Sequence, residues 1–304
     1  MRNAPADSRA SRNPSERSRN GQCDGTMWNL LALVESELEL VDVIDLNLAV
    51  AREIATIAQL DVSKYISVVD QWTADFRQRL PEYEGRFRAA PWKWKHDIRF
   101  FRIGMLQGFL GQEIGIRYVE DQKNVKSVRY TDPGQLFLHG LIDTKQGTCG
   151  NMAALHVAIA RRMGWPVSLA CVRSHLISRF DDGEVTYNIE ATSTHPGAFA
   201  SDPDEVYIQR FKLPERAIAC RSDLRKLTAR EMLGVFVALR ARYYADTGNS
   251  DEAERDYLLA RYLFPQYRAA YAASIPHIIS RGNCLFDRHE LGHPSSVREL
   301  LNAY

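Results

Sequence analysis

The chain has 304 residues, 45% of them hydrophobic, so it is long enough to bury the core of one large domain or two smaller ones. Its 39 basic and 38 acidic side chains leave a formal charge of +1, which excludes a strong overall field toward nucleic acid or an anionic membrane. No apolar run reaches the roughly 18 residues of a membrane helix, so we expect a soluble protein with neither nucleic acid nor membrane as partner.

The cysteines and histidines narrow the chemistry further. Five cysteines are scattered without a C-x-x-C pair, and their odd number argues against a disulfide framework and favours a reducing cytoplasm. The eight histidines are dispersed, and no carboxylate-rich calcium loop or glycine-rich nucleotide loop is visible. We therefore expect no metal and no cofactor.

The chain divides by composition into five predicted parts. A first segment rich in Arg, Ser, Asn and Pro is expected to be a disordered tail. Helical periodicity then gives way to an α+β core with a small antiparallel sheet, and a second helical region and a short tail follow. The predicted parts are 1–26 (disordered tail), 27–125 (N-terminal helical region), 126–215 (core), 216–280 (tetratricopeptide-like helical region) and 281–304 (C-terminal tail).

Two details of the N-terminal helical region carry predictions. Residues 81–91, bounded by two prolines, are predicted to be a polar connector, and a further helix is expected from about Ile98 to the glycines at 108 and 111. The sequence WKWKH at 92–96 mixes basic and aromatic residues. Since a nucleic-acid surface needs a broader basic stripe, helix packing with a solvated face is the preferred interpretation.

A short helix with clear ends is predicted to begin at Cys149. Thr148 is suited to the N-cap position, helical periodicity continues to Met163, and Gly164 with Pro166 is a stop signal. Apolar residues spaced by three and four positions form a stripe along this helix, and Cys149 lies on the same face. The cysteine is therefore expected to point inward at the helix N-terminus.

A β-hairpin is predicted after this helix, following a first β-rich run at 166–172. The runs 174–180 and 184–190 flank Asp182-Gly183, a dipeptide that is a strong hairpin signal. With a two-residue loop, His175 lies directly opposite Glu190; a four-residue loop is expected to preserve this register and a three-residue loop to break it. Directly opposed residues place their Cβ atoms about 4.5 to 5.5 Å apart, which allows a hydrogen bond between the imidazole and the carboxylate.

Cys149, His175 and Glu190 are thus predicted to form a Cys–His–acid triad. A helix N-terminus and an imidazolium stabilise a thiolate, and an imidazole held by a carboxylate serves as general acid toward a departing amine. Each residue also has a structural interpretation, as a core thiol, a satisfied strand histidine and a surface charge, but their convergence favours function. Cys171, in mid-strand, is expected to be buried and inert, and His156, about 10 Å along the helix, is too far from Cys149 to be its base.

The C-terminal helical region contains one repeat-like pattern. About three repeats are needed for an independent array, so packing of a single unit on the main domain is preferred to a free peptide-binding groove. The residues whose offsets match a tetratricopeptide-type helix–turn–helix are Tyr244, Gly248, Ala253, Tyr257, Ala260 and Pro265.

The segments QGTCGNMAALHVAIARRMGWPV, SHLISRF and YNIEAT resemble the transglutaminase-like superfamily. They look closest to a bacterial SirB-type, invasion-regulator-like branch, in which a helical region precedes the core and a tetratricopeptide-like tail follows it. The Y-x-D-P motif in RYTDPGQLFLHGLI and the A-x-R-x-G-x-P-V pattern from Ala160 to Val167 carry this closer similarity. The resemblance covers about residues 27–275, with specific motifs in 130–192.

The resemblance implies a cysteine-protease-like core in which Cys149 is the nucleophile, His175 the base and Glu190 the third member. The family usually has Asp-Pro where this chain has Glu190-Ala191, and Gly-His where it has Ser-His. The implied activity is acyl transfer through a thioester, on a glutamine carboxamide or peptide amide of a protein or peptide, with the Cys149 N–H in the oxyanion hole. The alternative is a non-catalytic interaction or regulatory protein that docks a protein partner through its tetratricopeptide-like helices.

Overall fold

A computed structural model describes residues 26–119, 128–173, 175–193 and 199–274 of the chain. The tails predicted at 1–26 and 281–304 lie outside these ranges, apart from Thr26. None of the helices in the described part combines the length and apolarity needed to span a bilayer.

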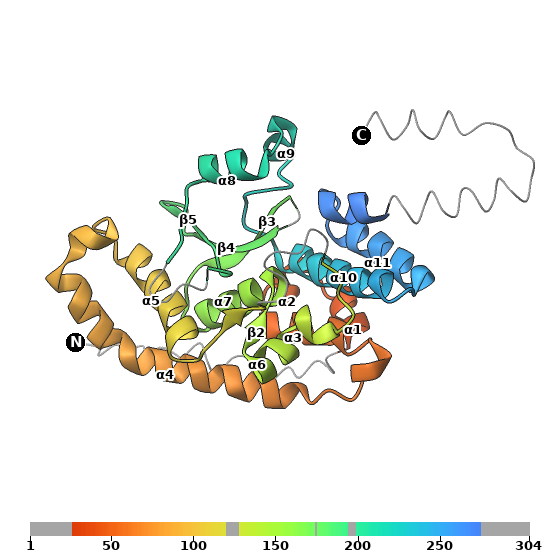
Figure 1. Cartoon of the computed structure of the whole chain (residues 1–304), viewed down its shortest axis with the longest axis horizontal. Coiled ribbons are helices and arrows are strands. Elements are labelled where there is room, and N and C mark those ends of the chain that lie inside the picture. The colour runs from red at the N-terminus through yellow and green to blue at the C-terminus, as the bar shows by residue number, and fades with distance from the viewer. Residues whose placement is uncertain (1–25, 120–127, 174, 194–198, 275–304) are drawn as a thin grey trace, which may run out of the picture.

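Helices surround a small sheet, in agreement with the predicted α+β class (Figure 1). Short 3-10 turns lie at Ala55–Ile57, Pro91–Trp94 and Pro133–Gln135. The other elements in chain order are α1 (Met27–Ala32), α2 (Glu35–Leu38), α3 (Val43–Ala51), α4 (Val62–Ala89), α5 (Ile98–Gln112), β1 (Arg117–Tyr118), α6 (Leu138–Thr144), β2 (Gln146–Gly147), α7 (Cys149–Arg162), β3 (Val167–Val172), β4 (His175–Asp181), β5 (Thr186–Ile189), α8 (Asp204–Phe211), α9 (Glu215–Ala219), α10 (Ala229–Asp246) and α11 (Ser250–Leu263).

Helix α7 lies at the centre of the molecule. Its start after Thr148 agrees with the sequence prediction, and the Thr148 N–H donates to Asn151 Oδ1 at 2.8 Å. The helix is buried from Gly150 to Ala160 rather than along a single stripe, because α3, α4, α5 and α6 pack around it and β3 and β4 cover a further side. The polypeptide therefore has little freedom to move the helix that begins with Cys149.

The three strands β3, β4 and β5 form an antiparallel sheet in chain order, and β1 pairs with β2 in a separate parallel pair. One face of the antiparallel sheet packs on α7. The other face, through Ala170, Val172 and Ile177, packs on Tyr207 of α8. The start of β4 is thus enclosed between helices on both faces of the sheet.

The hairpin β4–β5 has a different register from the predicted one. Asp181 pairs with Thr186 rather than with Glu184, which gives a loop of four residues that begins at Asp182. Asp182 Oδ1 accepts the N–H groups of Glu184 at 3.0 Å and Val185 at 2.9 Å, so these residues are held in a turn and not in the strand ladder.

The predicted direct opposition of His175 and Glu190 is therefore wrong. Glu190 follows the last residue of β5 and lies diagonal to His175. The register differs by two residues, so the alternation of side chains is preserved and both residues still project from the same face of the sheet. That face is the one covered by α8, because Ile177 on the same strand packs there.

The connector predicted at 81–91 is also wrong, because α4 continues through Pro81 and ends at Ala89. A proline in a helix interior removes one backbone hydrogen bond and costs roughly 3 kcal/mol. Tertiary contacts beyond the proline offset this cost: Tyr83 is buried, and its hydroxyl donates to Glu113 at the end of α5. A proline signal was thus overridden by packing between α4 and α5.

Helices α10 and α11 pack side by side as a helix–turn–helix, and α10 lies against α2 and α3 (Figure 1). A buried ion pair joins the two helices: the Arg240 guanidinium donates to Asp256 at 2.6 and 2.7 Å. Arg240 also donates to the Val50 carbonyl of α3 at 3.1 Å. The two helices therefore pack on the rest of the domain, which is the arrangement preferred from the sequence.

Replacing Asp256 by Ala is expected to lower the free energy of unfolding by about 3 to 5 kcal/mol, because the Arg240 guanidinium stays buried without its partner. The matched control is Glu252→Ala on the same helix, whose exposed pair with Arg255 contributes less than about 1 kcal/mol. Urea unfolding followed by circular dichroism measures both. Equal losses in the two variants would contradict the proposed importance of the buried pair.

Candidate active site

Cys149 is the first residue of α7, and its side chain is half-buried. The first N–H groups of a helix have no partner within the helix, and the positive end of the helix dipole stabilises a thiolate there. The chain enters through Gly147, where any Cβ would collide with Asn151 Oδ1. Glycine is therefore required for the close approach that sets the position of Cys149.

His175 is the first residue of β4 and contacts both other predicted members of the triad. Its Nε2 lies 2.8 Å from Glu190 Oε2. The ring also interacts with the Cys149 thiol, and the two side chains shift each other's pKa. The structure thus brings the three residues predicted from the sequence into one cluster around His175.

Glu190 lies in the turn that follows β5, with both carboxylate oxygens engaged. While Oε2 faces His175, Oε1 accepts from the Thr192 hydroxyl at 2.5 Å and from the Thr192 N–H at 3.2 Å. The backbone N–H of Glu190 donates to the Ala200 carbonyl at 3.0 Å. Diagonal residues on neighbouring strands lie farther apart than directly opposed ones. Glutamate is one methylene longer than aspartate, and this extra length lets Glu190 reach His175 from the diagonal position.

Phe211, the last residue of α8, covers one face of the imidazole. The two rings are stacked, with centroids 5.5 Å apart and planes inclined by 11°. Tyr207 also stacks with Phe211, with ring centroids 6.1 Å apart and planes inclined by 5°. Arg173 Nη1 donates to the Phe211 carbonyl at 3.1 Å and helps to hold the end of α8 over the site. An aromatic face against an imidazole excludes water and favours the charged ring.

The sequence analysis missed Thr192 and Phe211. The signal for Thr192 was weak, because turns closed by a side chain two residues earlier are typical of Asp and Asn rather than of Glu. For Phe211 there was no such signal, because only the packing of α8 on the sheet brings it to His175.

The three groups shift one another's pKa values. Burial raises the pKa of the Cys149 thiol, but the hydrogen bond and charge of His175 and the N–H of Leu176 outweigh it, and the pKa lies below its ordinary value. Burial also opposes a charged His175, yet its hydrogen bonds with Cys149 and Glu190 raise its pKa to about 10. Burial raises the pKa of Glu190, but His175 and Thr192 hold it below its usual range. The arrangement favours a thiolate–imidazolium pair oriented by a carboxylate.

The other cysteines of the described part do not belong to this cluster. Cys171 is buried in β3, and burial raises the pKa of its thiol well above the ordinary value, in agreement with the inert role expected for it. Cys220 is exposed after α9. Within the described ranges, no group of three His, Cys, Asp or Glu side chains is placed to hold a metal ion.

Comparison with known proteins gives a family match. A family model described as Transglutaminase-like superfamily matches residues 63–250, which is more than half of the chain. The matched range begins in α4, includes Cys149, His175 and Glu190, and ends at the start of α11. The searches of curated proteins and of solved structures gave no match.

We expect iodoacetamide to alkylate Cys149 faster than an ordinary thiol between pH 6 and 8. More of the thiol is ionised in this range because its pKa is lowered by His175, whose imidazolium persists until the pH passes its own pKa of about 10. An ordinary thiol with a pKa of about 8.5 gains roughly tenfold per pH unit over the same range. Peptide mass spectrometry follows Cys149, with the exposed Cys220 as internal reference.

His175→Ala is the variant that tests this profile. Without the imidazolium, burial raises the pKa of the Cys149 thiol. The alkylation rate at pH 6 should therefore fall roughly 100-fold and then rise with pH. A wild-type profile for Cys149 that follows that of Cys220 would contradict the ion pair.

Phe211→Leu is expected to lower the Cys149 alkylation rate at pH 6 by about 3- to 10-fold, because loss of the aromatic face admits water and weakens the imidazolium. Phe211→Tyr keeps the ring and should retain most of the rate. Phe199→Leu is the control, since that ring packs on Phe100. A loss of similar size in Phe211→Tyr, or none in Phe211→Leu, would refute the role of the stacked ring.

Proposed function

The chain belongs to the transglutaminase-like superfamily, and from this premise we propose that it is an enzyme in which Cys149, His175 and Glu190 carry out acyl transfer through a thioester. The observation that carries the proposal is the convergence of the three residues: the Thr192 hydroxyl donates to Glu190, Glu190 holds His175, and His175 interacts with the Cys149 thiol. The Cys149 side chain is half-buried at a helix N-terminus, where a thiolate is stabilised.

In the first half of the proposed reaction, the Cys149 thiolate attacks the carbonyl carbon of a glutamine carboxamide or peptide amide. A C–S bond forms, and the electron pair of the carbonyl moves to oxygen, where the Cys149 N–H donates to the oxyanion. The oxyanion then collapses and the C–N bond breaks. The His175 imidazolium gives its proton to the leaving nitrogen, so ammonia or an amine departs and a thioester with a neutral imidazole remains.

In the second half, His175 takes a proton from water or from a primary amine as that nucleophile attacks the thioester carbon. The C–S bond breaks and the thiolate–imidazolium pair is restored. Water gives hydrolysis or deamidation, and an amine gives transamidation. Glu190 stays ionised throughout and fixes the orientation of the ring through its contact with Nε2.

The proposal includes the finer features expected from the sequence. We place the protein in the SirB-type branch, take α10 and α11 as its tetratricopeptide-like unit, and assign a protein or peptide substrate. A reduced thiol is required for the chemistry, which favours a cytoplasmic location.

A non-catalytic interaction protein is the second candidate function. It is favoured by two large apolar side chains one turn apart on α11, Leu258 and Tyr262, which are 52% and 77% exposed. An exposed apolar face of this kind is typical of a protein-binding surface. In this second candidate, the triad is inactive and the α10–α11 hairpin binds a partner protein.

The test is detection of the acyl-enzyme. Purified protein is incubated with glutamine-containing peptides and a fluorescent primary amine, quenched in acid, and digested for mass spectrometry. We expect a thioester on Cys149, release of ammonia and incorporation of the amine, all absent in Cys149→Ala. Alkylation of Cys149 no faster than that of Cys220, together with an unchanged cellular phenotype in Cys149→Ser, would overturn the enzymatic proposal and leave the interaction role.

A further inference from the structure

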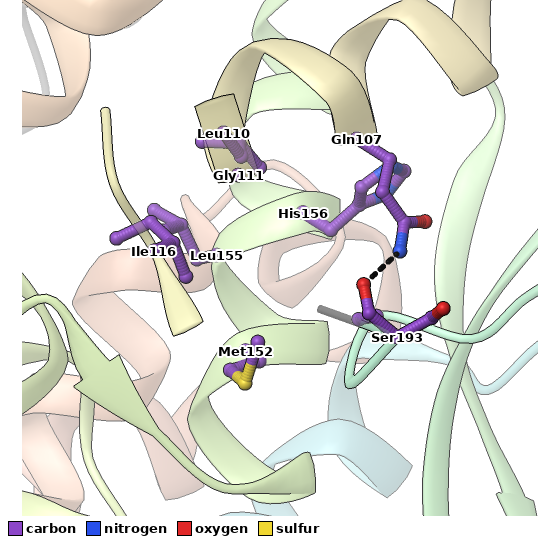
Figure 2. A pocket seen from close by; sticks show the side chains of 9 residues that line it. Gln107, Leu110, Gly111, Ile116, Met152, Leu155, His156 and Ser193 are labelled. Carbon is purple, nitrogen blue, oxygen red and sulfur yellow. Dashed lines mark hydrogen bonds between the residues drawn. The ribbon is translucent and has the colours of Figure 1, made fainter. Parts of the chain in front are cut away.

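The turn that carries Glu190 is held from a distant part of the chain. Gln107 of α5 directs its side-chain amide at this turn, and its Nε2 donates to the Glu190 carbonyl at 2.8 Å and to the Ser193 carbonyl at 3.3 Å (Figure 2). Within the turn, the Ser193 N–H donates to the same Glu190 carbonyl at 3.1 Å. One amide group therefore contacts both ends of the turn.

The chemistry of the two contacts determines the orientation of the amide. Both partners of Gln107 are carbonyl oxygens, which only accept hydrogen bonds, so the NH₂ group must face them. The flipped amide would place Oε1 against two oxygens. Gln107 is 8% exposed, so water is poorly placed to replace these bonds.

Gln107 is a polar residue at a buried position of α5. It is the single polar side chain among the buried residues of this helix, which are otherwise aromatic, aliphatic or glycine. Burying an amide costs about 1 to 3 kcal/mol unless it is hydrogen-bonded. A leucine would pack at this place without that cost, so the amide is explained by what it holds.

Gln107 also lines a small cavity. Gln107 Oε1 has no hydrogen-bond partner among the described residues, and neither ring nitrogen of the buried His156 makes one of good geometry, although the Ile103 carbonyl lies near that ring. Both side chains line a cavity of about 20 Å³ (Figure 2). This is room for about one water molecule. Burial lowers the pKa of His156 to about 4, so its ring is neutral and has one donor and one acceptor.

We propose that Gln107 is a positioning residue for the acid of the triad, an inference that rests on the proposed acyl-transfer function. Its amide fixes the Glu190–Ser193 turn, and the turn fixes the carboxylate that holds His175. Neither polar atom of the Gln107 side chain hydrogen-bonds with Cys149 or His175. Its effect on Cys149 must therefore pass through Glu190, and this sets it apart from a residue that only stabilises the fold.

A double-mutant cycle tests this route. The rate of Cys149 alkylation at pH 6 is compared in wild type, Gln107→Met, Glu190→Gln and the double variant, because Met keeps the length and burial of the side chain but has no N–H donor. Gln107→Met alone is expected to lower the rate by about tenfold, the size of effect that follows from a small misplacement of a catalytic group. In the Glu190→Gln background the same change should alter the rate less than about twofold, because the group it positions is already disabled. Gln112→Met, at the exposed end of α5, is the control and should leave the rate unchanged.

The outcomes separate the inference from the proposed function. An equal loss in both backgrounds, or no loss in a folded Gln107→Met protein, overturns the positioning role alone. If the Met variant lacks cooperative thermal unfolding, Gln107→Asn takes its place in the same cycle, since it withdraws the amide by one methylene and keeps a polar group. A wild-type Cys149 that reacts no faster than Cys220 overturns the proposed function and this inference with it.

Discussion

The packing of helix α7 against strand β4 is the constraint on which the candidate site depends. Cys149 begins the helix and His175 begins the strand, so the separation of sulfur and imidazole is set by how the two elements pack. Further along, the Ser178 hydroxyl of β4 donates to the Ala153 carbonyl of α7 at 3.1 Å, with both residues buried. This bond and the burial of α7 from Gly150 to Ala160 keep the two chain segments at a fixed offset. Neither reactive side chain needs to be held by a loop.

Charge pairing follows from that packing. Burial alone would raise the pKa of the Cys149 thiol and oppose the charge on His175, yet side by side each stabilises the ionised form of the other. Glu190 then compensates the imidazolium from the far side of the ring, and Phe211 keeps water from one face. The groups are interdependent because each is costly to bury charged without its neighbour. An aqueous surface would not require such support, and it would not lower the pKa of the thiol as far.

The parts predicted from sequence are those with local signals. Thr148 and Gly164 bracket α7, and Asp182-Gly183 marks the hairpin, so the elements that carry Cys149 and His175 were identified. The register was not, because the two N–H groups bound by Asp182 extend the turn at the expense of strand pairs, a balance of individual hydrogen bonds that the sequence pattern does not resolve. The diagonal relation of His175 and Glu190 kept them together only because the register changed by an even number of residues.

Contacts between residues far apart in the chain could not be predicted from sequence patterns. Gln107 lies 83 residues before Glu190, and Phe211 reaches His175 only through the packing of α8. In the sequence, Gln107 stands out only as an amide among the apolar residues of its helix. This pattern does not indicate which residue the amide contacts. These contacts give a physical reason for the extent of the family match, which begins in α4 although the recognisable motifs begin near residue 130. Helices α4 and α5 are packed together through Tyr83 and Glu113, and α5 holds the turn of the acid, so the helices before the motifs belong to the same structural unit as the triad.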